Sequence, residues 1–257
     1  MRKRWVLLIL ILALAGGAGW WFRGTLNQWI QLIPGGENIR LLQKPKPDPK
    51  TYATLIKDLE RWRNDLATRY VKAKTAGDRR AVEADARIIL EGALPGMMRC
   101  WLGTPWDFNG TAKGPGGGKI ACGYFVATVL KDAGFQVDRY QLAQQPSENI
   151  LRSFIPRESC ALSVGKDYQA FTEEVRNREP GVYVVGLDTH VAFIVVRDGD
   201  FHFIHSSGSR PWCVVDERPE EAGVLQRSSW RMLGNLTSDS ALLRRWLKSE
   251  KIVVRGT

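Results

Sequence analysis

The chain has 257 residues, of which 44% are hydrophobic and 25% charged, as in an ordinary globular protein. This composition excludes a disordered acidic chain, a collagen-like repeat and a protein with several membrane spans. Four cysteines are too few for a disulfide scaffold. The formal net charge of +10 is compatible with nucleic acid, an anionic membrane surface or a cell-wall polymer as partner.

The first part of the chain has the pattern of an exported protein. Residues 5–22 carry no charge and follow three basic residues, which is typical of an export signal or a membrane anchor. The Ala-Leu-Ala sequence at 13–15 resembles an A-x-A cleavage site, whereas the aromatic residues at 20–22 match a membrane interface. We predict a signal anchor or signal peptide over residues 1–23 and favour the uncleaved anchor. The rest of the chain would then face the periplasm or the cell wall.

Most of the positive charge flanks this apolar stretch. Residues 1–50 hold eight basic and two acidic side chains, which leaves a charge of only +4 for the rest of the chain. The composition therefore no longer favours nucleic acid as a partner. We expect the protein to contact the membrane through its N-terminal segment. Prolines and glycines at residues 34–49 predict a linker over residues 24–50.

Two helices are predicted after the linker. Apolar residues recur at steps of three and four between Tyr52 and Lys74, which is the helical period. We predict a turn at residues 76–78 and a second helix that ends near Pro95. Together they would form a helical hairpin over residues 51–95, followed by a second domain over residues 96–257.

The second domain combines one strong helix with a series of strands. Cys122 opens an apolar helical pattern that ends at Gly134. The glycines at residues 114–118 do not have the spacing of a phosphate-binding loop, and we predict a surface loop there. Strand patterns occupy residues 181–186, 191–196 and 201–205, and an Asp-Gly turn joins the last two. Residues 212–215 are a possible further strand. A helix followed by antiparallel strands predicts an α+β fold.

Cys122 is the candidate nucleophile. It lies in the first turn of the predicted helix, where unpaired backbone N–H groups and the helix dipole stabilise a thiolate and lower the thiol pKa. The same N–H groups would hold the oxyanion of an acyl-transfer intermediate. A nucleophilic cysteine also needs a base, usually a histidine that a third group orients.

All three histidines of the chain lie in the region of the predicted strands: His190 opens the second strand pattern, and His202 and His205 lie on the third. His202 and His205 are three residues apart and point to opposite faces, so only one of them can face His190. Two other interpretations remain open, because a cysteine on an apolar helix face is more often a core residue. Cys122, His190 and His205 would also be possible metal ligands, but the chain has no close-spaced ligand pair of the zinc type. We predict no metal and no cofactor.

Four segments resemble the NlpC-type cell-wall peptidases, a family of papain-like cysteine enzymes. Residues 103–106 read Gly-Thr-Pro-Trp where the family has Gly-Thr-Pro-Tyr, and residues 121–126 read Ala-Cys-Gly-Tyr-Phe-Val for Asp-Cys-Ser-Gly-Phe-Val. Residues 190–194 read His-Val-Ala-Phe-Ile for His-Val-Gly-Ile-Tyr, and residues 203–206 read Phe-Ile-His-Ser for Phe-Ile-His-Ala. The resemblance extends over about residues 98–210, with the motifs in the family's order.

The resemblance implies a papain-like domain in which the helix of the nucleophile packs on an antiparallel sheet. Cys122 would be the nucleophile, His190 the general base and then acid, and His205 the group that orients His190. The family cleaves amide bonds in peptidoglycan stem peptides without a metal. The expected protein is therefore an exported cysteine endopeptidase or amidohydrolase with a peptidoglycan peptide or another amide as substrate.

The chain also departs from the family pattern. Ala121 replaces an acidic residue, and Trp106 and Tyr124 replace a tyrosine and a glycine, which makes both aromatic residues candidate substrate-binding residues. Two alternatives remain: a catalytically silent wall-binding or scaffold module of the same fold, and a cysteine hydrolase or acyltransferase with lipid or small-molecule substrates. If Cys122 stays free, the other three cysteines allow at most one disulfide, and the sequence selects neither a pair nor an oligomeric state.

Overall fold

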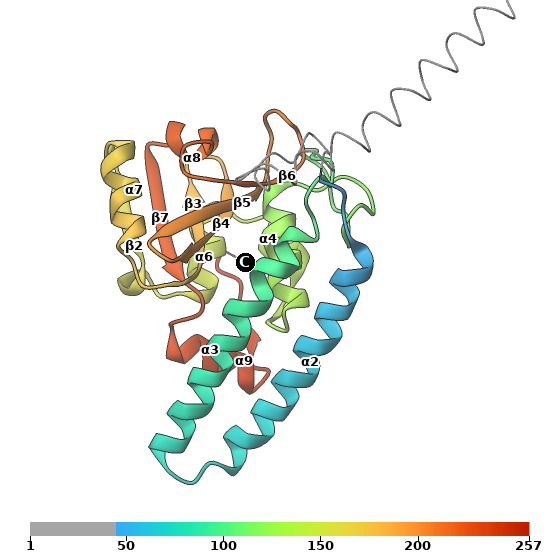
Figure 1. Ribbon diagram of the computed structural model, residues 1–257, viewed down its shortest axis with the longest axis vertical. Coiled ribbons are helices and arrows are strands. Elements are labelled where there is room, and N and C mark those ends of the chain that lie inside the picture. The colour runs from blue at the N-terminus through green and yellow to red at the C-terminus, as the bar shows by residue number, and fades with distance from the viewer. Residues whose placement is uncertain (1–44, 257) are drawn as a thin grey trace, which may run out of the picture. The chain divides into compact units, whose positions relative to one another are not determined.

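The computed structural model describes residues 45–256 (Figure 1). The predicted membrane segment over residues 1–23 and most of the predicted linker lie outside these residues. Among the residues described, no helix is both long enough and apolar enough to cross a bilayer. The described chain contains eight α-helices and a six-stranded antiparallel sheet, which confirms the prediction of an α+β fold.

The sheet has the strand order β2-β7-β3-β4-β5-β6, and every neighbouring pair is antiparallel. Its strands are β2 (Ala161–Val164), β3 (Gly181–Leu187), β4 (Val191–Arg197), β5 (Asp200–Ser206), β6 (Val214–Glu217) and β7 (Trp230–Asn235). Asp198 and Gly199, both with positive φ, form the two-residue turn between β4 and β5, as the Asp-Gly pair predicts. The hairpin brings the segment that begins after His190 alongside the strand that carries His205.

Helices cover both faces of the sheet (Figure 1). The larger hydrophobic core joins one face to α2 (Pro49–Lys72), α3 (Ala76–Arg99), α4 (Cys122–Asp132), α6 (Ser147–Phe154) and α9 (Ser240–Leu247). The smaller core joins the other face to α7 (Tyr168–Arg176) and α8 (Gly223–Arg227). Alternate residues of each central strand therefore belong to different cores.

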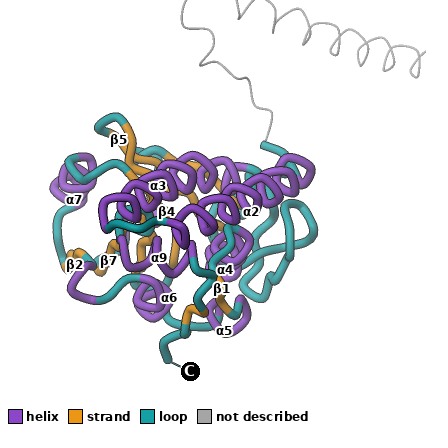
Figure 2. The backbone as a smooth tube through the Cα atoms, turned by 90° about the horizontal axis from the view of Figure 1, so that it is seen from below, coloured by secondary structure: helices purple, strands orange, loops and turns teal. Residues whose placement is uncertain are grey.

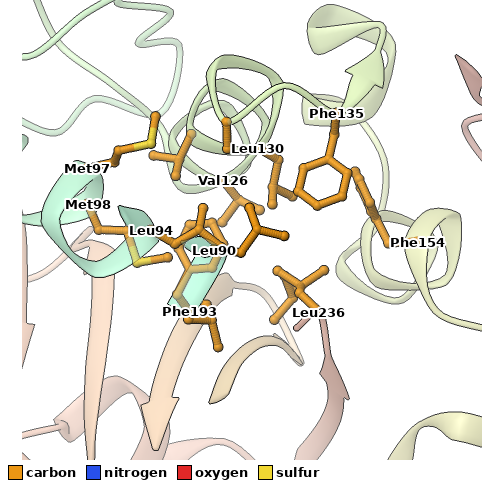
Figure 3. Packing of buried hydrophobic residues seen from close by; sticks show 14 of the residues in the cluster. Leu90, Leu94, Met97, Met98, Val126, Leu130, Phe135, Phe154, Phe193 and Leu236 are labelled. Atoms are coloured by element: carbon orange, nitrogen blue, oxygen red, sulfur yellow. The ribbon is translucent and has the colours of Figure 1, made fainter. Parts of the chain in front are cut away.

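The larger core fixes α4 against the sheet. Phe193 of β4 is fully buried and packs among side chains of α3 and α4 (Figure 3). Its ring contacts that of Phe125 edge to face, with 5.8 Å between the centroids. This packing sets the position of the first residue of α4, which is Cys122.

The two long helices α2 and α3 lie side by side (Figure 2). The predicted turn at residues 76–78 is wrong, because these residues form the first turn of α3. The Oγ1 of Thr75 accepts a hydrogen bond from the Asp78 N–H, and the Asp78 carboxylate accepts one from the Thr75 N–H, which together form a capping box. The predicted end near Pro95 is also wrong: α3 continues to Arg99, since burial of the turn around Pro95 offsets the missing N–H.

Several short elements lack a clear sequence pattern. The sequence does not predict β2, β7, α5 (Arg139–Ala143) or β1 (Gln136–Val137). Near the C-terminus, β8 (Lys251–Ile252) pairs in parallel with β1. The glycine-rich residues 114–118 form turns and bends rather than a regular element, as expected for a loop.

Candidate active site

Cys122 is the first residue of α4, as the helical pattern predicts. The N-cap residue Ala121 makes no side-chain hydrogen bond, so no cap side chain occupies the N–H groups of the first turn. Gly123 allows this turn to approach α5, because a Cβ there would lie 2.4 Å from the carbonyl oxygen of Ala143. The start of α4 is thus held close to neighbouring backbone while its N–H groups stay available.

Cys122 and His190 line one pocket of about 880 Å³. The thiol lies against the start of β4, since its sulfur accepts a hydrogen bond from the backbone N–H of Val191. Both candidate substrate-binding residues, Trp106 and Tyr124, also line this pocket. The structure therefore brings the candidate nucleophile, the candidate base and both aromatic residues together.

His205 lies behind His190. The Nε2 of His190 and the Nδ1 of His205 are 2.8 Å apart, and the two rings are almost perpendicular. This hydrogen bond uses Nε2 of His190 and leaves its Nδ1 unengaged by His205. His202 points away to the opposite face of β5, where its Nδ1 lies 2.6 Å from Asp216 Oδ1. Of the two histidines on β5, only His205 belongs to the site.

Burial keeps the thiol and the imidazoles uncharged. Desolvation raises the pKa of the Cys122 thiol, and the N–H groups of Val191, Gly123 and Cys122 itself oppose that rise without cancelling it. The prediction that the helix N-terminus lowers this pKa is therefore wrong for the resting protein. Burial lowers the pKa of His190 well below its usual value, with a further contribution from His205, and burial lowers the pKa of His205 to about 3.

Glu217 is part of the same hydrogen-bonded group and is absent from the sequence-based candidates. Its Oε2 lies 3.2 Å from the Nε2 of His205. Burial, with the nearby carboxylate of Glu221, raises the pKa of Glu217 to about 7. The possible fourth strand that the sequence predicts, residues 212–215, ends before Glu217. In the structure β6 extends to Glu217, and its pairing with β5 places this side chain on the same face of the sheet as His205.

The two aromatic residues form different walls of the pocket. Trp106 packs on Trp212, with ring centroids 5.5 Å apart, and against the backbone of Gly208. Tyr124 lies in the first turn of α4, and its hydroxyl accepts a hydrogen bond from Gln144 Nε2 at 3.3 Å. Both rings are partly exposed and can contact a bound molecule.

Cys100, Cys122 and Cys160 are free thiols in the structure. Within residues 45–256, no group of three or more His, Cys, Asp and Glu side chains has an arrangement that could hold a metal ion. The metal-site interpretation of Cys122 with the two histidines therefore has no geometric support in this part of the chain.

The fold and the site define an α+β protein with a cysteine at a helix N-terminus and a hydrogen-bonded histidine pair beside the same pocket. Comparison with protein-family models, with curated proteins and with solved structures finds no match for this chain. Its function must be inferred from the site geometry and from the motif resemblance.

Proposed function

We propose that this protein is an exported cysteine amidohydrolase that cleaves amide bonds in peptidoglycan stem peptides. The main support is the 2.8 Å hydrogen bond between His190 Nε2 and His205 Nδ1, beside a pocket that Cys122 and His190 share. A base held by a third group next to a thiol is the arrangement that nucleophilic catalysis by cysteine requires.

In the proposed reaction, His190 Nδ1 takes the thiol proton while Sγ of Cys122 bonds to the carbonyl carbon of the substrate. The N–H groups in the first turn of α4 stabilise the resulting oxyanion. The C–N bond then breaks, and His190 returns the proton to the departing amine nitrogen. Water attacks the thioester and gives a proton to His190, and Cys122 recovers it as the acid product leaves.

The direction of the pKa shifts favours general-base catalysis. A raised thiol pKa and a lowered imidazole pKa keep the resting pair neutral rather than as a thiolate and an imidazolium. Proton transfer then accompanies nucleophilic attack, which is the role of a general base.

The substrate class is inferred from the motif resemblance and from the predicted export of the chain. A peptide would bind along the pocket between Trp106 and Tyr124, and residues 1–23 would hold the protein at the cytoplasmic membrane, facing the periplasm or the cell wall. A silent scaffold of the same fold has no chemical need for a buried histidine pair beside a thiol. A lipid or small-molecule substrate would use the same three residues and is an alternative outcome of the test.

Digestion of purified peptidoglycan tests the proposal. The detergent-solubilised full chain, Cys122→Ala and Cys160→Ala would be incubated with it, and soluble products resolved by mass. Cys160 is a matched control, since it is partly buried and does not line the pocket. We expect new stem-peptide fragments from wild type and Cys160→Ala, and none from Cys122→Ala.

Fragments from all three proteins would rule out Cys122 as the nucleophile. Absence of fragments from wild type would rule out the peptidoglycan substrate.

A further inference from the structure

We propose that Glu217 is a positioning residue that selects the tautomer of both histidines and so determines whether His190 can act as a base. This inference, which rests on the proposed function, extends the hydrogen-bonded group to His190, His205 and Glu217, beside the thiol of Cys122. Glu217 would not touch the substrate; it would act through His205.

Both ring nitrogens of His205 have their hydrogen-bond partners within this group. Its side chain is fully buried, and its two ring nitrogens lie 2.8 Å from His190 Nε2 and 3.2 Å from Glu217 Oε2. The ring of Phe203 covers it, with 4.3 Å between the centroids. A buried neutral imidazole donates from one nitrogen and accepts at the other, so the partner at Nε2 decides what Nδ1 can do.

An ionised Glu217 sets the tautomer that catalysis needs. A carboxylate only accepts hydrogen bonds, so His205 must donate its Nε2–H to Glu217 and accept at Nδ1. His190 must then donate its Nε2–H to His205, which leaves a lone pair on His190 Nδ1. That lone pair is the one that takes the thiol proton.

A protonated Glu217 permits the opposite arrangement. Its O–H can donate to His205 Nε2, so that His205 carries its proton on Nδ1 and donates to His190 Nε2. His190 then carries its proton on Nδ1 and has no lone pair facing the thiol. The base is lost although no heavy atom needs to move.

This contact differs from a structural salt bridge. Burial lowers the pKa of His205 to about 3, so the imidazole is neutral at physiological pH and the contact with Glu217 is a hydrogen bond rather than an ion pair. Glu217 itself, 18% exposed, has a pKa of about 7 because burial disfavours its charge. The switch between tautomers therefore falls near neutral pH.

Titratable and charged groups from three elements besides β6 surround Glu217. The carboxylates of Glu221 and Asp216 raise the pKa of Glu217, and the guanidinium of Arg227 lowers it. The groups that face Glu217 are His205 on β5, Tyr168 on α7, Glu221 just before α8 and Arg227 in α8; Asp216, next to it on β6, points to the opposite face.

The test combines histidine ¹⁵N NMR, which distinguishes a protonated from an unprotonated ring nitrogen, with the pH dependence of kcat on peptidoglycan. Three variants of the solubilised full chain would be compared with wild type: Glu217→Gln, Glu221→Gln and Asp216→Asn. Glu221→Gln alters the surroundings of Glu217 and leaves its side chain intact. Asp216→Asn removes a neighbouring carboxylate that contacts His202 instead of His205.

In wild type we expect His190 Nδ1 to lose its proton, and kcat to rise, through pH of about 7. Glu217→Gln should abolish this step in the spectra, because an amide does not titrate, and should lower kcat at pH 8 by about 10-fold or more, a part of the roughly 10²–10⁴-fold that a general base contributes. Glu221→Gln should move the step to lower pH, since loss of a nearby negative charge eases ionisation of Glu217. Asp216→Asn should keep the step and move it to lower pH by less than Glu221→Gln does, because Asp216 raises the pKa of Glu217 less than Glu221 does.

A wild-type spectrum without a tautomer change between pH 6 and 8, or the same change in a folded Glu217→Gln protein, would overturn the inference. Since Glu221→Gln retains the relay, an unshifted step in that variant would also count against it. The spectra need no substrate: a tautomer change without peptidoglycan fragments would refute only the proposed function. Fragments without a tautomer change would refute only the role of Glu217.

Discussion

At the scale of single residues, His190 and His205 are buried, and burial lowers the pKa of both imidazoles. Two neutral rings hydrogen-bonded to each other can be buried at modest cost, whereas an imidazolium in the same place would lose its hydration. The unfolded chain, in contrast, can protonate both rings freely. The stability of the protein must therefore depend on pH in the range where the unfolded histidines titrate.

For His205 the folded pKa lies at about 3, below its usual value of 6.5. Its contribution to stability is complete above pH 6.5 and is lost as the pH falls toward 3, by about 1.4 kcal/mol per pH unit. Urea unfolding at pH 7 and pH 5 should show a larger loss of stability in wild type than in His205→Gln, by about 2 kcal/mol.

Glu217 contributes to the pH dependence with the opposite sign, because its raised pKa makes the folded protein less stable as the pH rises toward and through 7. Burial is the main cause of this raised pKa, so the contribution of Glu217 is present in both wild type and His205→Gln. Equal losses of stability in wild type and His205→Gln would contradict a buried neutral histidine.

At the scale of elements, two helical glycines have opposite consequences. Gly92 lies inside α3, and a Cβ there would meet nothing within 4 Å. Gly123 lies in the first turn of α4, and a Cβ there would collide with the backbone of Ala143. The first glycine only adds flexibility, while the second is required for the approach of α4 to α5.

Alanine substitutions at these two glycines should therefore differ in sign. Gly92→Ala should stabilise the protein by about 0.5–1 kcal/mol, since alanine has the higher helix propensity. Gly123→Ala should destabilise it, because the clash is with backbone that cannot rotate away. Denaturant midpoints would measure both effects. A Gly123→Ala protein as stable as wild type would mean that α4 does not pack against α5 in this way.

The elements that the sequence predicts best are those with a regular apolar period. The helix that starts at Cys122 and the strands around the Asp-Gly turn have such a pattern; they carry Cys122 and His205, and His190 directly precedes β4. The continuation of α3 through Pro95 depends on tertiary burial, which local propensity does not reveal. Glu217 was missed for a related reason: only the pairing of β6 with β5 brings it next to His205.

At the scale of the whole molecule, the candidate site joins the two cores that the sheet separates. Cys122 belongs to α4 and packs at the margin of the larger core, whereas His205 shares a strand face with Phe203 of the smaller core. The candidate site therefore spans the end of β4, with the thiol at one layer and the histidine pair at the other. Positioning of the thiol and tuning of the base depend on different layers of the fold.

Alkylation of the four cysteines is the most direct test of the claim that Cys122 is a nucleophile activated by His190. Iodoacetamide would be added to native wild type and His190→Ala at pH 7.5, and modification of each cysteine followed over time by peptide mass spectrometry. Cys160 is an internal reference, because burial raises its pKa to about 11 and it lies outside the pocket.

We predict that Cys122 reacts faster than Cys100, Cys160 and Cys213 in wild type. His190→Ala should slow Cys122 and leave the rate at Cys160 unchanged. A Cys122 rate no higher than those of the other cysteines, or one unaffected by loss of His190, would contradict a thiol activated by this histidine.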